Sequence, residues 1–293
     1  MHNPRDNDID QRLIDAAEAG NLEAVEDLLS RGANPRHQES TALSFAAQRG
    51  HVECLRLLIP LSDPQANNSH AIRSASAKGH VECVKLLIPV SDPKASASTA
   101  LRWAATNGHT ECVKLLIPVS DTKPRNSRDS SALCWAAFNG HADCVRLLIP
   151  VSPPKAEDSK ALRWAAAKGH VECLKDLIPV SDPQASESDA LRAAARNGNA
   201  ECFKLLIPLS APLIEMEAVL FNALSAGHAG IIALMLAHEP RFLAKIDLPE
   251  NLQAAIAQDH TELEALLRSI IEHQELSGHL SPRRTAIHKS ARL

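Results

Sequence analysis

One landmark recurs along the whole chain, because most of its glycines stand in a single register. Eight of the eleven glycines follow one another at intervals of 29, 30 or 32 residues. They are Gly20, Gly50, Gly79, Gly108, Gly140, Gly169, Gly198 and Gly227. The sequence around the glycines repeats as well, since Ala100–Ala105 and Ala161–Ala166 are both Ala-Leu-Arg-Trp-Ala-Ala. A self-similar period of this length predicts stacked units that each contact only their neighbours.

Each unit reads as two short helices. The first carries Leu101, Ala104 and Ala105 at the i, i+3 and i+4 spacing of one apolar helical stripe, and the glycine then closes it with a left-handed turn. The second is expected from about Val81 to Ile88, with an inner stripe of Cys83, Leu86 and Leu87, and the following proline ends it. We therefore predict an all-α solenoid of about nine helix-turn-helix repeats, the last of which has Asp259 in place of the glycine.

These residues resemble the ankyrin repeat, whose unit reads T-P-L-H-x-A-A, then G-H, then a Leu-rich second helix. Thr99–Leu101, Ala104-Ala105, Gly108-His109 and Leu115-Leu116 match that pattern, and Leu13–Pro35 matches it most closely. The common spacing of 29 residues is shorter than the family's repeat of about 33. The missing residues fall where an ankyrin repeat projects a β-hairpin finger, so the resemblance implies short inter-repeat loops here.

The repeat region is expected to span residues 9–272, with a divergent C-terminal cap at 213–272. Residues 273–293 form a basic tail that we expect to be disordered. A three-residue insertion near Thr122–Asn126 widens one loop, which is expected to lie beside the partner.

Composition narrows the function. The chain is 45% hydrophobic but only 3% aromatic and has no tyrosine, which is unlike a globular enzyme with a lined pocket. Its formal charge of −4 gives no global attraction to nucleic acid, and no apolar run reaches the roughly 18 residues of a membrane span. Seven cysteines without a secretory segment predict a cytoplasmic protein, which we also expect to be monomeric. Alternatives are a peroxisomal protein, from Ala291-Arg292-Leu293, and, by the ankyrin resemblance, a host-directed bacterial effector.

Metal and catalytic sites are not expected. Five repeats carry His-x-x-Cys, as in His80 and Cys83, which could offer two zinc ligands. The histidine, however, falls in the turn between the helices, and the cysteine falls on the stripe that holds buried leucines. A buried thiol has a raised pKa and is a poor nucleophile. We predict no metal, no cofactor and no enzymatic activity.

The position five residues before each glycine points away from the core stripe and varies between repeats. It holds all three tryptophans, in consecutive repeats. By resemblance, this position lines the concave groove of the family and faces the partner. Successive copies about 10 Å apart would form an aromatic strip of roughly 20 Å. The predicted partner-binding residues are Phe45, Arg49, Lys78, Trp103, Trp135, Phe138, Trp164, Lys168 and Arg196.

Three interpretations of this face stay open. It could bind a protein or an extended peptide, preferably acidic, as a scaffold or adaptor. It could bind nucleic acid or another polyanion by stacking on tryptophan, which the net negative charge disfavours. In the third interpretation the chain is a spacer, and the tryptophans only clamp neighbouring repeats by stacking on Arg73, Arg102, Arg163 or Arg192.

Overall fold

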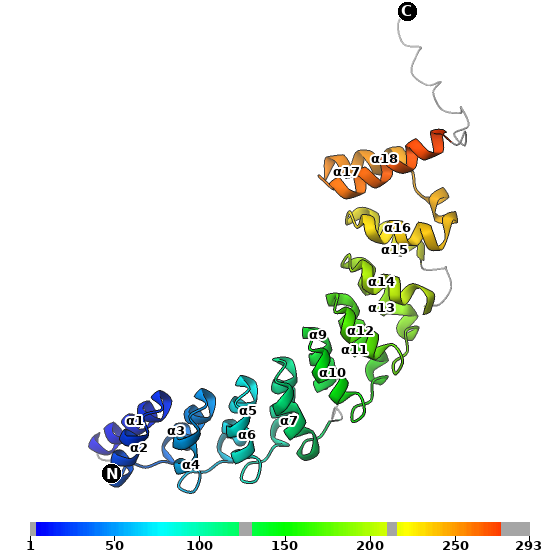
Figure 1. Cartoon of the computed structure of the whole chain (residues 1–293). Helices are drawn as coiled ribbons and strands as arrows, with labels where there is room; N and C mark the ends of the chain where they lie inside the picture. Colours follow the sequence, from blue (N-terminus) through cyan, green and yellow to red (C-terminus); the bar gives the residue numbers. More distant parts are fainter. Residues whose placement is uncertain (1–3, 123–130, 210–215, 277–293) are drawn as a thin grey trace, which may run out of the picture. The chain divides into compact units, whose positions relative to one another are not determined.

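The structure is a computed structural model that describes residues 4–122, 131–209 and 216–276. Within these ranges the chain is helical and contains no strand, so the all-α prediction is confirmed (Figure 1). The chain divides into two compact units, Met1–Ala190 and Leu191–Leu293, which are described separately. The insertion after Thr122 and most of the predicted basic tail lie outside the described residues.

In the first unit a first helix alternates with a shorter second helix. The first helices are α1 (Pro4–Ala19), α3 (His37–Arg49), α5 (Ala66–Lys78), α7 (Ala95–Thr106), α9 (Ala132–Asn139) and α11 (Ala156–Lys168). The second helices are α2 (Leu22–Ser30), α4 (Val52–Leu58), α6 (Val81–Leu87), α8 (Thr110–Leu116), α10 (Ala142–Leu148) and α12 (Val171–Leu177). A single 3-10 turn, η1 (Ile117–Val119), follows α8, and α13 (Ala185–Arg196) crosses the boundary between the units.

The second unit keeps the same alternation. Its elements are α14 (Ala200–Leu206), η2 (Ile207–Leu209), α15 (Met216–Ser225), α16 (Ala229–His238), η3 (Pro240–Lys245), α17 (Leu248–Ala257) and α18 (Thr261–Leu276). None of the described helices is long and apolar enough to cross a membrane.

The core lies between consecutive repeats. First helices pack against first helices and second helices against second helices along the first unit. The stripe of Leu101, Ala104 and Ala105 is buried, as predicted. On the second helix the prediction was partly wrong, because Leu86 is half-buried and Val84 lies in the core beside Cys83 and Leu87. The helix is packed from its own repeat and from both neighbours, so its buried face is the i, i+1, i+4 set.

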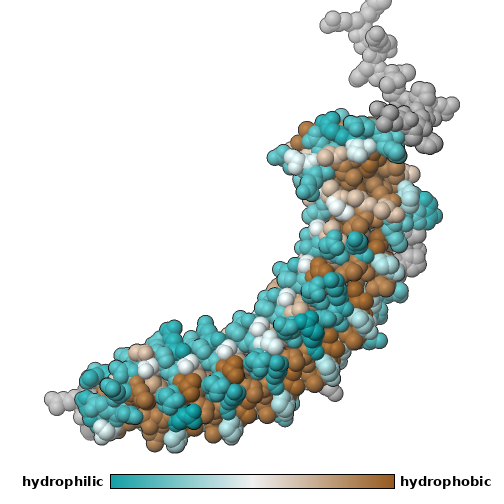
Figure 2. Space-filling view, in the orientation of Figure 1, coloured by the Kyte–Doolittle hydropathy of each residue, from teal (hydrophilic) through white to brown (hydrophobic). Residues whose placement is uncertain are grey.

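Hydrophobic and hydrophilic residues alternate from one helix pair to the next on the visible surface of the first unit (Figure 2). The pattern recurs because equivalent positions of successive repeats reach the same surface. The ion pairs of the second helices follow the same rhythm. Glu82–Lys85 and Glu111–Lys114 are i, i+3 pairs with N–O distances of 2.7 and 2.6 Å.

The landmark glycines close the first helices in the left-handed conformation. Gly50 and Gly79 have φ of 80° and 78°, and Asp259 has φ of 57° at the equivalent place. The next second helix begins directly afterwards, at Val81, and ends at Leu87 with Ile88 as its cap before the proline. The predicted boundaries of this helix are therefore correct to within one residue.

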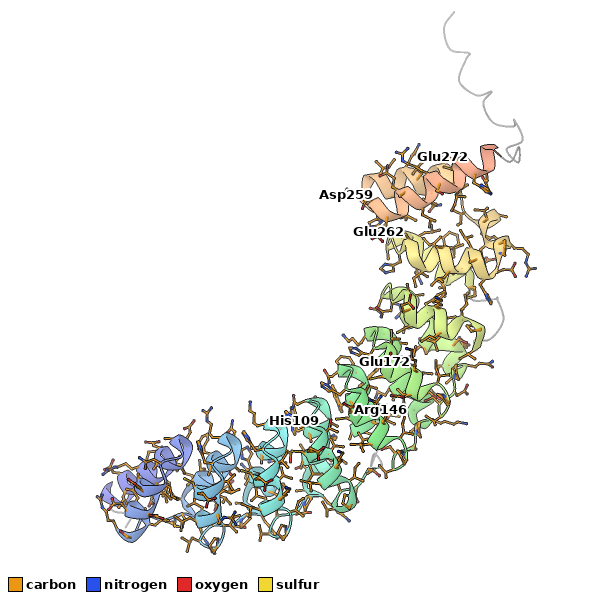
Figure 3. The ribbon with its side chains drawn as sticks, viewed as in Figure 1. His109, Arg146, Glu172, Asp259, Glu262 and Glu272 are labelled. Carbon is orange, nitrogen blue, oxygen red and sulfur yellow. The ribbon has the colours of Figure 1, made fainter. Side chains whose placement is uncertain are left out.

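A histidine from the next repeat lies against each of several glycines. A Cβ added to Gly79 would lie 2.5 Å from Nδ1 of His109, so no side chain fits there. The other ring nitrogen of His109, Nε2, lies 3.1 Å from the carbonyl oxygen of Ala77 (Figure 3). His51, His80, His141 and His170 repeat this contact with the preceding repeat in the first unit. The histidine therefore joins two repeats through one ring.

The inter-repeat loops that the structure describes in full are short, as predicted, and a recurring turn joins each to the following first helix. In α5 this turn is a kink within the first residues of the helix, where Asn67, Asn68 and Ser69 take three successive left-handed conformations, with φ of 49°, 54° and 56°. The buried Ser69 hydroxyl oxygen then accepts a hydrogen bond of 2.9 Å from the backbone N–H of Asp92, one repeat later. Equivalent bonds link Ser40 to Asp63, Ser98 to Asp121 and Ser159 to Asp182. The loops thus bond the repeats on the side opposite the histidines.

Substitutions at two glycines distinguish backbone strain from a clash with the histidine ring. Gly79→Ala places a Cβ in the ring of His109, whereas Gly32→Ala meets no atom within 4 Å, although Gly32 also has a positive φ of 91°. We expect Gly32→Ala to cost about 1–2 kcal/mol of backbone strain. Gly79→Ala should cost about 2–4 kcal/mol, because it also displaces the histidine and its hydrogen bond. Urea unfolding followed by circular dichroism measures both, and equal losses would contradict the proposed role of the ring.

Candidate functional site

The candidate site is the first-helix face, meaning the outward side chains of α3, α5, α7, α9 and α11. These helices place Phe45, Trp103, Trp135 and Trp164 in equivalent positions, five residues before the glycine. Trp103 is 48% exposed, while the other three are half-buried. Trp103 is therefore the tryptophan that presents most of its ring to solvent.

Three of the aromatic rings form a cluster. Trp135 and Trp164 have ring centroids 5.4 Å apart, and Phe138 lies 5.8 Å from the first and 5.1 Å from the second. All three contacts are edge-to-face, with interplanar angles of 74°, 63° and 67°. The predicted even spacing of about 10 Å is wrong for this pair of repeats, because large side chains lean across the space between their backbones. Among the described residues, no ring contact joins Trp103 to this aromatic trio.

Two lysines lie on the aromatic trio. Lys160 has its ammonium 4.9 Å from the Trp164 ring centroid and also pairs with Glu157 at 2.6 Å. Lys168 has its ammonium 4.6 Å from the Phe138 ring centroid. Lys160 and Trp164 lie in the same helix, α11, whereas the Lys168–Phe138 contact joins α11 to α9. The cation–π contact between repeats therefore pairs a lysine with a phenylalanine, and not an arginine with a tryptophan as the clamp interpretation suggested.

The basic rim is partly neutralised inside the molecule. Arg49 pairs with Glu18 of the preceding repeat at 2.6 Å. Arg163 pairs with Asp189 of the following repeat at 2.8 Å. Lys78 is exposed and makes none of the ion pairs found among the described residues. Arg196 is exposed in the second unit, so it is not placed with the others.

Arg73, which the clamp interpretation named but which was not among the predicted partner-binding residues, is partly buried on this face. Its Nη2 donates a 2.8 Å hydrogen bond to the carbonyl oxygen of Asn67, and its Nε is buried without an acceptor. Burial lowers the pKa of Arg73 below its ordinary value. The pKa of the neighbouring His70 is also lowered, first by burial and then by the charge of Arg73. Both effects indicate a cation that is partly removed from water.

The repeated His-x-x-Cys motif does not form a metal site. Cys83 and Cys112 are fully buried, and Nε2 of His80 and His109 lies 3.0 and 3.1 Å from a backbone carbonyl oxygen. Within residues 4–122, 131–209 and 216–276, no three His, Cys, Asp or Glu side chains gather as metal ligands would. The cysteines act as small core residues.

The described part of the chain is a stack of paired helices whose variable, outward positions carry aromatic residues. A family model described as ankyrin repeats matches in three copies, at residues 13–97, 74–158 and 162–247. The chain belongs to the ankyrin repeat family. No significant match to a curated protein is found.

Ankyrin repeats generally mediate protein–protein interaction, and the family is typically non-catalytic. The family match supports a binding scaffold. The number of repeats, about nine, stays a prediction, because the three matched blocks do not count single repeats.

The cysteines supply a test of the core. Burial raises the pKa of Cys83, Cys112, Cys173 and Cys202 to about 11. At pH 8 only about one thiol in a thousand would then be the reactive thiolate. We expect the folded chain to react slowly with a chromogenic disulfide reagent, and all seven cysteines to react promptly after unfolding in urea. A thiol that reacts rapidly in the folded chain would contradict this account of the His-x-x-Cys motif.

Proposed function

We propose that the protein is a non-catalytic scaffold or adaptor that holds a partner protein, through an extended peptide segment, on its first-helix face. The observation that carries the proposal is the exposure of Trp103, a large aromatic ring in a register where the stack itself needs no side chain. Tryptophan is among the commonest hot-spot residues of protein interfaces.

The aromatic trio supports the proposal in a different way. Its rings contact one another and two lysine ammonium groups, so they form a preorganised apolar surface that begins one repeat away from Trp103. A preorganised surface loses little conformational entropy when a partner binds. The aromatic trio thus stabilises the stack and also provides a contact surface for the partner. Trp103 contributes to binding and not to packing between rings.

A polyanion is the weaker candidate for this face. The positive charges of Arg49 and Arg163 are paired with carboxylates, and the chain carries a net charge of −4. Nucleic-acid binding depends on many uncompensated cations and falls steeply with added salt.

Trp103→Ala is the direct test. Random peptides displayed on phage would be selected on the full chain, and synthetic copies would be titrated against wild type and variant by fluorescence anisotropy. We expect Trp103→Ala to weaken binding about 30-fold, the loss typical of a hot-spot tryptophan. Thermal unfolding should change little, because the ring packs against no other ring among the described residues.

Leu61→Ala is the matched control. Leu61 is 42% exposed and lies after α4 in an inter-repeat loop, away from the first-helix face. Its removal should leave peptide affinity unchanged. Equal losses for the two variants, or selected peptides that bind Trp103→Ala as tightly as wild type, would overturn the proposal. Tighter binding of single-stranded oligonucleotides than of peptides, with an affinity that falls steeply as salt is added, would favour the polyanion.

A further inference from the structure

One register position of the first helices holds an arginine in several repeats, and one of them shows what that position binds. Arg163 lies six residues before Gly169, and its Nη1 bonds to Oδ2 of Asp189 at 2.8 Å. Asp189 comes from α13, the first helix of the following repeat. The two side chains are only 28% and 26% exposed. A carboxylate from beyond the helix therefore compensates this half-buried guanidinium.

Arg73 occupies the same register position in α5, six residues before Gly79. The residue that corresponds to Asp189 in the following helix, α7, is Thr99. Threonine has no charge, and the Thr99 hydroxyl already accepts a 3.1 Å hydrogen bond from Nη2 of Arg102. Among the ion pairs of the described residues none involves Arg73. The same arginine position is thus neutralised in one repeat and uncompensated in the other.

The surroundings of Arg73 favour an anionic ligand. Its Nη2 bonds to a neutral backbone oxygen, that of Asn67. His70 and Ser74 flank it, within 3.4 Å of each other, and neither carries a negative charge. A guanidinium partly removed from water gains most from a carboxylate, because a charge-assisted hydrogen bond strengthens as the local dielectric falls.

We propose that Arg73 binds an aspartate or glutamate side chain of the partner, which takes the place that Asp189 takes against Arg163. The inference rests on the proposed function, since it assigns the partner segment to the first-helix face. It adds the chemistry of that segment: an acidic residue over α5, next to an apolar residue on Trp103 of the adjoining α7. The partner is therefore an acidic peptide segment and not a purely apolar one.

The other cations of this face are less suited to that role. Arg49 is already paired with Glu18, and the Lys168 ammonium lies on the Phe138 ring. Lys78 is exposed, so an ion pair with it would be screened by water and salt. Arg73 is positively charged and partly buried, and the Arg163–Asp189 pair shows which ligand this register position binds.

The experiment uses peptides selected on the full chain whose binding depends on Trp103. Each Asp or Glu of such a peptide is changed in turn to Asn or Gln, and each version is titrated against wild type and Arg73→Met. We expect one acidic position whose amide version binds about tenfold more weakly to wild type. The same amide replacement should leave the affinity of the peptide for Arg73→Met unchanged. Such non-additivity is the signature of a direct interaction in a double-mutant cycle.

A pair of exchanged substitutions provides the matched control. Thr99→Asp supplies Arg73 with the carboxylate that Arg163 already has, so it should weaken the acidic peptide by about as much as Arg73→Met. Asp189→Thr removes the carboxylate from Arg163 and should leave the affinity at the Arg73 site unchanged. Circular dichroism and thermal unfolding of all three variants establish that each still folds.

The outcomes separate the two proposals. If no selected peptide depends on Trp103, the proposed function itself fails. If peptides depend on Trp103 but show no acidic preference, or if Thr99→Asp and Arg73→Met bind them like wild type, only the carboxylate assignment is overturned. A phosphoserine in place of the acidic residue that binds far more tightly, and only when Arg73 is present, would replace the carboxylate by a phosphate and also overturn the assignment.

Discussion

The stack depends on the contact between a histidine and the glycine of the preceding repeat. His109 has one ring nitrogen against the Cα of Gly79 and the other within hydrogen-bonding distance of the Ala77 carbonyl. A single side chain thereby fills the space left by the absent Cβ and satisfies a carbonyl at a helix end, where four oxygens lack intrahelical partners. Glycine is required twice over, because the backbone has a positive φ of 78° and the ring leaves no room for a Cβ. The contact recurs from repeat to repeat, so it sets the distance between neighbouring first helices throughout the first unit.

That regularity separates the positions that stabilise the stack from those that are available for function. The leucine and alanine stripes face neighbouring repeats, the cysteines lie in the core, and the serine hydroxyls of the loops bond to the next repeat. The outward position of the first helix takes part in none of these contacts, so its side chain can vary. Trp135 and Trp164, in adjoining repeats, meet and pack with Phe138. Trp103 has Ser74 on one side and Trp135 on the other, makes no ring contact found among the described residues, and stays exposed.

Much of this architecture follows from the sequence because the repeat averages out local ambiguity. The period, the ends of α6, the left-handed glycines and the burial of the cysteines are all visible in the spacing of Gly79, Cys83 and Pro89. The remaining features depend on side-chain conformation or on contacts between distant residues. The clustering of Trp135 with Trp164 requires rotamers that lean across a repeat, and the left-handed turn at Asn67–Ser69 requires a backbone that those residue types do not specify. The pairing of Arg163 with Asp189 links positions 26 apart, which a helical wheel of one repeat does not bring together.

The site proposed at Arg73 would arise with little change to the core of the repeats. Arg73 and Arg163 are in the same register, and both have a buried Nε without an acceptor. One difference lies in the following repeat, which has aspartate at position 189 and threonine at position 99. An ion pair of two half-exposed groups contributes modestly to stability, so its loss in one repeat is tolerated by a stack whose other contacts are intact. The uncompensated guanidinium is already partly desolvated in the free protein. Binding of a partner's carboxylate therefore requires less further desolvation of Arg73. On this argument, specificity in the first-helix face arises as much from an acid that the chain lacks as from the tryptophans that it displays.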